Sequence, residues 1–227
     1  MVLQDIYDYL SFGEFRQLFL SGKGIDIDNV SAIPRDKFPQ ILPLVVLGLT
    51  EIYKRFQIKE GNTQVPLVHG TSLYSISAPD LLKIERVYGI YLGKKYEIPL
   101  NIIGKEDAIR TPSVTSLLIP SDTEEAPWLT ETSELDVYYR ANHPAIDAEE
   151  ANCFPPKVSL ELPSMYLEPL IYYIASKVLT PRGVSNETNL GNTYTAKFEA
   201  AVVQLKILNF EIDDGSESYL LHERGFA

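Results

Sequence analysis

The sequence has few of the residues that mark a disulfide framework or a metal site. It contains one cysteine, Cys153, and three histidines, His69, His143 and His222. A single cysteine excludes a disulfide within the chain, and this usage is typical of a reducing compartment. The histidines are far apart in the sequence and lack zinc-ligand spacing. His143 and Cys153 are the nearest pair, and we interpret both as ordinary loop residues.

Long apolar runs are also missing. The longest one, from Ile41 to Leu49, contains Pro43 and Gly48 and is too short to cross a bilayer. The first residues have neither a basic region nor an apolar run, so we expect no signal peptide. These features predict a soluble protein that is made in the cytoplasm.

Basic residues are outnumbered by acidic ones. The chain has 20 Lys and Arg against 31 Asp and Glu, which gives a formal net charge of -11. Such a protein repels the phosphate backbone, so we do not expect it to recognise a DNA sequence. Two interpretations of the acidity stay open: it keeps the chain soluble, or it forms a surface that lies near DNA without binding it.

Apolar and aromatic residues, in contrast, are plentiful. Hydrophobic residues make up 45% of the 227 positions, enough for the core of one large domain or of a domain with an insertion. The chain also has 14 tyrosines and 9 phenylalanines. These rings either serve interfaces, where they give large contact areas, or fill positions in β-sheets.

Two helical patterns begin the chain. Leu3, Ile6, Tyr7 and Leu10 have helical spacing and predict a short amphipathic helix. A second stripe of period 3.6 extends to about residue 57, with Asp36 as the expected N-cap and a proline inside that favours a kink. The apolar positions of this second stripe are Phe38, Ile41, Leu42, Val45, Leu49, Ile52, Tyr53 and Phe56.

The periodicity changes between residues 59 and 139. Short apolar runs are broken there by Gly70, Pro79 and Gly89. Residues 91–98 have the pattern of two strand ends around a turn, and residues 116–119 and 135–139 have the pattern of strands. We therefore predict an antiparallel β-subdomain in this part of the chain.

Helical periodicity returns after the Phe154-Pro155-Pro156 break. One helix is expected to begin at Pro163-Ser164, with Ser164 as its N-cap, and to stop at residues 180–183. The last helix is expected to begin at residue 186 or 188. The predicted apolar stripes are Leu167, Leu170, Ile171, Ile174, Ala175 and Val178 in the first helix, and Leu190, Tyr194, Phe198, Ala201, Val202, Leu205 and Leu208 in the second.

Together these patterns predict an α+β fold. Helices from both ends of the chain form a helical core, and the antiparallel β-subdomain is inserted between them. The predicted boundaries are residues 1–58 and 150–215 for the helical core, 59–149 for the insertion and 216–227 for a C-terminal tail.

The sequence contains no convincing catalytic motif. No serine has a nucleophile-elbow pattern, and Gly22-Lys23-Gly24 lacks the ending of a phosphate-binding loop. Paired carboxylates such as Asp26 and Asp28 are common in solvated loops. We therefore predict no enzymatic activity and no cofactor. Because catalytic triads form in space, an α+β enzyme or ligand-binding domain of unknown substrate remains the alternative.

Several segments occur in an order that is similar to a known family. A strand that runs into a proline-containing loop, residues 135–146, precedes a "leucine-proline then long helix" segment, residues 160–175, and a helix rich in aromatic residues, residues 192–200. Residues 3–10 and 47–56 add to the likeness. This order resembles the head-to-tail connector, or adaptor, proteins of short-tailed bacteriophages. The resemblance covers the helical framework, whereas the β-region matches only in kind.

That resemblance implies a structural virion protein without catalytic residues or cofactor. Such connectors form a homo-oligomeric ring, usually a dodecamer, beneath the portal protein at the head–tail interface. They extend the DNA channel, retain the packaged genome until ejection, and dock tail nozzle and tail fibre proteins. Packaged DNA passes through without sequence-specific binding, and no membrane is involved. An acidic channel wall agrees with this role, because it lets DNA slide.

Two segments are candidate contact sites. The loop with Asp122, Glu124 and Glu125 is expected either at the channel or tail side of the ring, or as a plain solvated loop. The C-terminal tail carries apolar side chains that could each bury area in a partner. Because similar connectors send this segment into the portal, we expect it to become ordered against the portal or a neighbouring subunit. The alternative is that it folds back onto its own helices. The tail residues are Tyr219, Leu220, Leu221 and Phe226.

Overall fold

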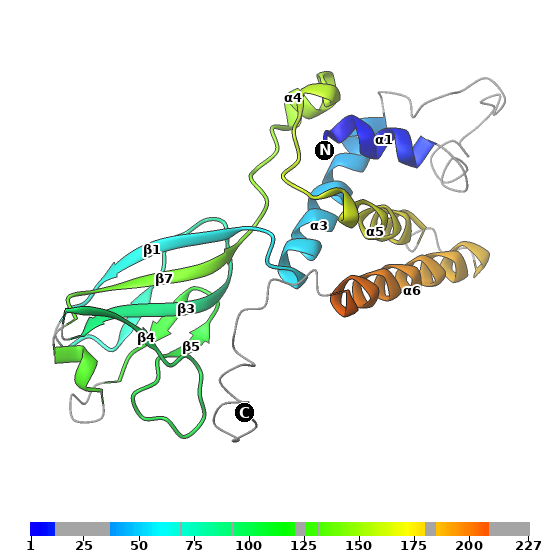
Figure 1. Cartoon of the computed structure of the whole chain (residues 1–227). Helices are drawn as coiled ribbons and strands as arrows, with labels where there is room; N and C mark the ends of the chain where they lie inside the picture. Colours follow the sequence, from blue (N-terminus) through cyan, green and yellow to red (C-terminus); the bar gives the residue numbers. More distant parts are fainter. Residues whose placement is uncertain are drawn as a thin grey trace, which may run out of the picture. The chain divides into compact units, whose positions relative to one another are not determined.

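A computed structural model of the chain describes residues 1–11, 37–68, 70–91, 93–120, 126–130, 132–179 and 185–208. The chain divides into two units, of which unit 1 comprises Met1–Ile52 and Ala145–Ala227 and unit 2 comprises Tyr53–Pro144. Helices from both ends of the chain flank an inserted antiparallel sheet region, so the predicted α+β fold is confirmed (Figure 1). The predicted insertion, residues 59–149, has bounds a few residues away from those of unit 2.

Unit 1 is helical in its described parts. Each of its longer helices buries an apolar face. The elements are α1 (Leu3–Ser11), α3 (Phe38–Arg55), α4 (Ala148–Cys153), α5 (Leu167–Leu179) and α6 (Ser185–Ile207), with 3-10 turns η4 (Pro155–Lys157) and η5 (Ser164–Tyr166). The last three residues of α3 belong to unit 2.

The first two helices bury the stripes that the sequence predicted. Leu3, Ile6 and Leu10 of α1 are fully buried, and all eight predicted apolar positions between Phe38 and Phe56 are buried as well. The Tyr7 and Phe38 rings stack with their centroids 4.1 Å apart, which holds α1 against the beginning of α3. Residue 36, the predicted N-cap of α3, lies outside the described residues.

Helix α5 packs against both α3 and α6. A Cβ atom on Gly48 of α3 would lie 2.5 Å from Leu170 Cδ1 and 3.1 Å from Tyr173 Cδ1. The missing side chain therefore lets α3 approach α5 closely. On the α6 side, the Tyr173 and Phe198 rings meet edge to face with centroids 5.4 Å apart. These contacts make α5 the middle helix of the three (Figure 1).

Two helix starts differ from the prediction. Ser164 was predicted to be an N-cap, but it is the first residue of η5, and Pro163 occupies the cap position without a side-chain hydrogen bond. The proline fixes its own φ at -59°, and the chain enters a 3-10 turn before α5 begins. The last helix begins at Ser185 rather than at Asn186 or Thr188.

A short helix that the sequence did not predict precedes the Phe154 break. Helix α4 has six residues, too few to reveal a 3.6-residue period. Its signal is the N-cap, because Asp147 Oδ1 accepts hydrogen bonds from the backbone N–H groups of Glu149 at 2.8 Å and Glu150 at 3.3 Å.

The predicted stripe of α6 is only partly buried. Tyr194, Phe198 and Val202 are buried, whereas Leu190 and Leu208 are exposed, so the prediction was wrong for the two ends. Helix α6 has 23 residues and α5 has 13, which corresponds to about 34 Å against about 20 Å of helix. Because α6 is longer than its partner, its ends extend past the surface that α5 can cover.

Unit 2 contains two antiparallel sheets (Figure 1). They share one apolar core that includes Val87, Leu117, Trp128 and Leu135. The larger sheet has the order β1 (Glu60–Pro66), β7 (Glu134–Ala141), β3 (Leu81–Tyr91) and β4 (Lys94–Ile98), and the smaller has the order β2 (Leu73–Ser75), β6 (Ser116–Leu118) and β5 (Arg110–Ser113). The 3-10 helix η3 (Pro127–Thr130) carries Trp128. The strands predicted at 91–98, 116–119 and 135–139 are confirmed.

The first and last strands of unit 2 pair with each other. Their antiparallel register runs from Glu60 opposite Arg140 to Pro66 opposite Glu134. This pairing brings the segment that enters unit 2 beside the segment that leaves it.

Arg140 strengthens the same junction. Its Nη1 donates to the Lys54 carbonyl oxygen at 2.7 Å. Its Nη2 lies 2.8 Å from Glu85 Oε1, close enough for an ion pair although not aligned as a hydrogen bond. The side chains of Arg140 and Glu85 are only 14% and 4% exposed, so removing either partner would leave a poorly solvated charge.

Gly61 is the position where the β1–β7 pair leaves no room for a side chain. A Cβ atom there would lie 2.5–2.7 Å from three atoms of the Tyr139 side chain, whose hydroxyl donates to Asp80 Oδ1 at 3.0 Å. We expect Gly61→Ala to lower the free energy of unfolding by about 1–3 kcal/mol, measured by urea denaturation. The exposed neighbour Asn62→Ala is the control and should change it by less than about 0.5 kcal/mol.

A double variant tests the cause of that loss. In a Tyr139→Leu background the ring is gone, so Gly61→Ala should cost much less than it does in the native chain. Equal costs in the two backgrounds would contradict the predicted clash.

Tyr7 gives unit 1 a defined response to alkaline pH. Its hydroxyl is buried and has no hydrogen-bond partner among the described residues, and burial raises the pKa of Tyr7 to about 12. This value lies above the ordinary 10.0. Because the pKa of Tyr7 is higher in the folded state, folding favours the protonated hydroxyl. The free energy of unfolding is therefore unaffected by Tyr7 ionisation below pH 10 and falls as the pH rises from 10 towards 12.

Tyr7→Phe removes this titrating group. We expect the free energy of unfolding at neutral pH to stay equal or to rise by about 1 kcal/mol, because an unsatisfied buried hydroxyl disappears. Denaturation measured across the alkaline range should show a smaller loss of stability than in the native chain. The exposed Tyr9→Phe variant should keep the native alkaline loss, and the same curve for both variants would contradict the assignment.

Candidate functional site

The residues that the sequence suggested as contact sites are not among those the structure describes. Asp122, Glu124 and Glu125 lie outside the described residues. The same holds for the C-terminal tail, with Tyr219, Leu220, Leu221 and Phe226. The roles of both segments therefore stay predictions.

His143 and Cys153 are the histidine and cysteine that lie nearest to each other in the sequence. The His143 ring packs edge-on against Tyr53, with centroids 5.6 Å apart, and its Nδ1 lies 2.6 Å from the Pro144 carbonyl oxygen. Cys153 is exposed and belongs to the other unit. Within the described ranges, no group of three or more His, Cys, Asp or Glu is placed to hold a metal ion. In the same ranges, no helix combines the length and the apolar character that a membrane span requires.

A polar network connects all four strands of the larger sheet. Lys95 Nζ lies 3.0 Å from Asp136 Oδ2, donates to the Tyr138 hydroxyl at 3.1 Å and sits 4.9 Å from the centroid of the Tyr88 ring. Gln64 Nε2 donates to Asp136 Oδ1 at 3.2 Å. The hydrogen bond from Lys95 lowers the pKa of Asp136, and the bond to Tyr138 raises the pKa of Lys95. Both shifts favour the charged forms of Asp136 and Lys95. The network therefore has the properties of an ion pair that stabilises strand pairing rather than of a proton-transfer site.

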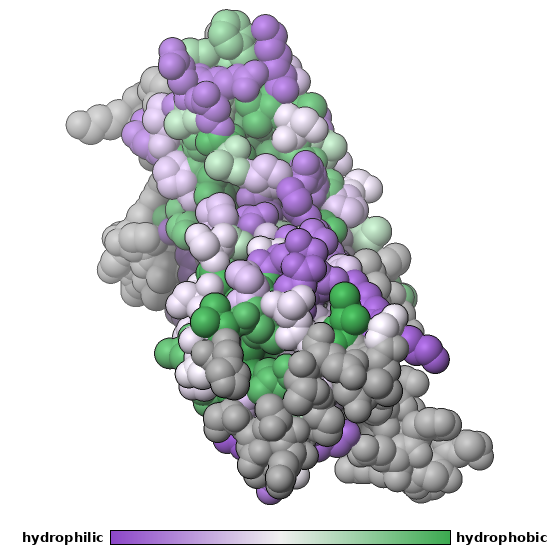
Figure 2. Space-filling view, turned by 90° about the vertical axis from the view of Figure 1, so that its left-hand side faces the viewer, coloured by the Kyte–Doolittle hydropathy of each residue, from purple (hydrophilic) through white to green (hydrophobic). Residues whose placement is uncertain are grey.

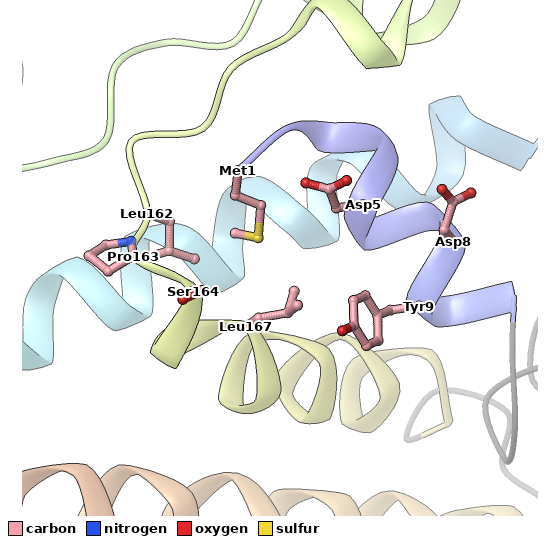
Figure 3. Close-up of a pocket in the computed structure, with 8 residues that line it drawn as sticks. All are labelled: Met1, Asp5, Asp8, Tyr9, Leu162, Pro163, Ser164 and Leu167. Carbon is pink, nitrogen blue, oxygen red and sulfur yellow. The ribbon is translucent and has the colours of Figure 1, made fainter.

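A hollow of about 680 Å³ lies between α1 and the beginning of α5 in unit 1 (Figure 3). The side chains of Met1 and Tyr9 extend towards Leu167, whereas the Asp8 carboxylate points away from it. Asp8 Oδ1 accepts a hydrogen bond from Gln4 Nε2 at 2.7 Å, and Asp5 Oδ2 accepts one from the Val2 backbone at 2.8 Å. The two carboxylates thus stabilise the first turns of α1 and do not face each other as a catalytic pair. The lining residues are Met1, Asp5, Asp8, Tyr9, Leu162, Pro163, Ser164 and Leu167.

Unit 2 exposes two isoleucines on the loop that connects β4 to β5. Ile103 is 100% exposed and Ile102 is also exposed, beside a hollow of about 500 Å³ that reaches Arg110 and Leu118. The base of this loop is fixed, because the backbone N–H of Ile109 donates to the Pro99 carbonyl oxygen at 2.9 Å. Apolar residues also lie among polar ones on the face of the molecule drawn in Figure 2.

Asn101 is the residue that ties this loop to β5. Its φ of 55° is in the left-handed region, its Nδ2 donates to Thr111 Oγ1 at 2.7 Å, and its Oδ1 accepts from the Thr111 backbone at 2.8 Å. We expect Asn101→Gly to lose only the hydrogen bonds, at a cost of about 0.5–1.5 kcal/mol.

Asn101→Ala should cost more than the glycine variant, by about 1 kcal/mol, because alanine also strains at positive φ. Urea denaturation of both variants measures the difference. An alanine variant as stable as the glycine variant would contradict the role of the backbone conformation.

Helix α3 leaves one apolar face uncovered by the described residues. Pro39, Pro43, Val46 and Leu47 are exposed, with Leu47 at 53%, and we call these four residues the α3 face. No charged residue occurs in α3 before Glu51. Apart from the exposed Gln40, the side chains before Thr50 are apolar on every side, and a helix that is apolar all round is normally buried. The α3 face therefore has the composition of a contact surface.

Helix α6 has an uncovered apolar face too. Ala196, Ala200, Val203 and Ile207 are exposed, Val203 at 52% and Ile207 at 76%, and we call these four residues the α6 face. Their spacings of four, three and four residues place them on one side of the helix, as in a coiled-coil seam. This second stripe lies on the side of the helix opposite the buried stripe of Tyr194 and Phe198.

The sequence did contain signals for both faces. The first was the uncharged run from residue 38 to residue 50, and the second was a repeat of small and apolar residues displaced from the aromatic stripe of α6. The predicted apolar stripes contained only the residues that a single chain was expected to bury. Neither exposed face was therefore predicted. No protein-family model matches the chain, and no curated protein is similar to it in sequence.

Proposed function

We propose that this chain is a structural virion protein that forms a ring beneath the portal of a short-tailed bacteriophage. In that position it extends the DNA channel, retains the packaged genome and docks the tail nozzle or tail fibre proteins. The observation that carries the proposal is the pair of uncovered apolar surfaces on unit 1, the α3 face and the α6 face.

Energetics favour the burial of these faces in an assembly. Burying a large apolar side chain is worth about 1.5–3 kcal/mol before ordering costs are subtracted. Val46, Leu47, Val203 and Ile207 are exposed in the single chain. Contiguous apolar patches on a protein surface commonly mark interaction sites. A subunit of a permanent assembly is the class of protein that this surface fits best.

The order of elements supports a connector among the possible assemblies. The segments that carry the resemblance correspond to β7 with the loop that follows it, to α5, to α6, to α1 and to the second half of α3. The packing of α5 against both α3 and α6 gives these segments a common framework. The net charge of -11 supports passage of DNA without binding.

Removal of the gene from a phage that encodes the chain tests the proposal. We expect heads that package DNA but carry no tails and lose their genome, because the ring that closes the portal vertex is missing. Electron microscopy of the particles and a plaque assay give the readout, with a plasmid copy of the gene as the control. Complete infectious particles without the gene would contradict the proposal. That result would agree with the alternative role, an enzyme or ligand-binding domain.

The C-terminal tail gives a second test. Deleting residues 216–227 should leave the circular dichroism spectrum and the unfolding midpoint unchanged, because the described helices and sheets end before residue 209. The truncated chain should fail to attach to portal-bearing heads in a sedimentation assay. Replacing the same residues by a Gly-Ser segment of equal length is the control for length alone. Normal attachment of the truncated chain would show that the tail is not needed for binding to the portal.

A further inference from the structure

The α3 face and the α6 face cannot cover each other within one subunit. Helix α5 packs between these two helices, through Gly48 and Leu170 on one side and through Tyr173 and Phe198 on the other. The uncovered faces of α3 and α6 therefore point away from α5 in different directions. Among the residues that the structure describes, nothing covers either face.

The two faces have complementary relief. Ala196 and Ala200 make the first half of the α6 face shallow, and small residues let a second helix approach closely. Val46 and Leu47 project from the α3 face and are large enough to fill such a depression. The faces also have similar lengths, because the rise from Pro39 to Leu47 is about 12 Å and the rise from Ala196 to Ile207 is about 17 Å.

The composition of the faces favours protein over other ligands. Neither face contains a charged residue, so neither offers the cations that a nucleic acid requires. Packed apolar side chains at a helix spacing of about 8–10 Å are typical of contacts between two helices.

In the proposed ring, the partner of each face is a second copy of this chain. A closed ring needs two different complementary surfaces on every subunit, since each copy contacts its two neighbours through opposite sides. Unit 1 has two such surfaces on the two helices that flank α5. A contact of α6 with α6 across a two-fold axis would bury one of these faces and leave the α3 face exposed.

We propose that the α3 face of one copy packs against the α6 face of the next copy, so that subunits associate head to tail through unit 1. This inference rests on the proposed ring and adds the surfaces through which it closes. Its failure and the failure of the ring can be told apart by the experiment below.

Cross-linking of single-cysteine variants tests the contact. Cys153→Ser first removes the only cysteine of the chain. Leu47→Cys and Val203→Cys are then made separately in this background, mixed in equal amounts at high concentration and treated with a short bismaleimide. We expect a covalent dimer in the mixture and almost none with either variant alone. Leu47→Cys mixed with Val114→Cys, an exposed position of unit 2, is the matched control.

The outcomes separate the alternatives. A covalent dimer from Val203→Cys alone, as strong as that from the mixture, would show a two-fold contact and overturn the inference. The same cross-linking on assembled particles that carry both variants covers a ring that forms only on the portal. No dimer in the free chain or in particles that contain the ring overturns the inference while the proposed function stands. A dimer from a chain that is absent from virions would overturn the proposed function and leave the inference intact.

Charge variants provide an independent measurement of the same contact. Leu47→Glu should weaken self-association, measured by sedimentation, by about tenfold to a hundredfold, because an apolar contact is replaced by a buried charge. Combining it with Val203→Lys should recover part of the loss, since the opposite charge then faces it. Val114→Glu should leave self-association unchanged. A loss from Val114→Glu as large as that from Leu47→Glu would contradict a contact specific to the helix faces.

Discussion

The pairing of β1 with β7 is the interaction on which the arrangement of the chain depends. Unit 1 is made from two segments far apart in sequence, and they can pack into one unit only if the insertion between them returns to its starting point. Antiparallel pairing of the first and last strands meets this requirement, because the Ala141 N–H donates to the Lys59 carbonyl oxygen at 2.9 Å. The hydrogen bond from Arg140 to the Lys54 carbonyl oxygen and the ion pair of Arg140 with Glu85 stabilise the same junction.

Because the insertion closes on itself, each unit has its own packing. Unit 2 has its own apolar core around Trp128, with a polar network across the larger sheet. Unit 1 packs α1, α3, α5 and α6 on one another but leaves the α3 face and the α6 face open, as far as the described residues show. The helical unit carries the surfaces that we assign to assembly.

The sequence predicted the buried faces of the fold well and its polar edges poorly. The stripe from Phe38 to Phe56 was visible because its apolar residues recur at helical spacing. Strand β1, in contrast, has the sequence EGNTQVP. Its burial alternates, but Val65 is the only large apolar residue among its inward positions, so the sequence shows no alternation of apolar and polar residues. Strand order is a property of pairing between distant segments, and no local pattern contained it.

The candidate site was harder to predict for a related reason. Periodicity shows which residues a helix hides, but an exposed face of Ala196, Ala200 and Val203 resembles an ordinary surface until the buried side has been assigned. The acidic loop and the C-terminal tail, which the sequence favoured, lie outside the described residues.

Cryo-electron microscopy of the head–tail vertex tests the central claim most directly. We expect a closed ring of copies of this chain, coaxial with the portal, in which every subunit shows helical unit 1 and the inserted sheets of unit 2. The channel should pass through the middle of this ring. A vertex without the chain, or the chain present only as an isolated monomer away from the portal, would contradict the proposed role.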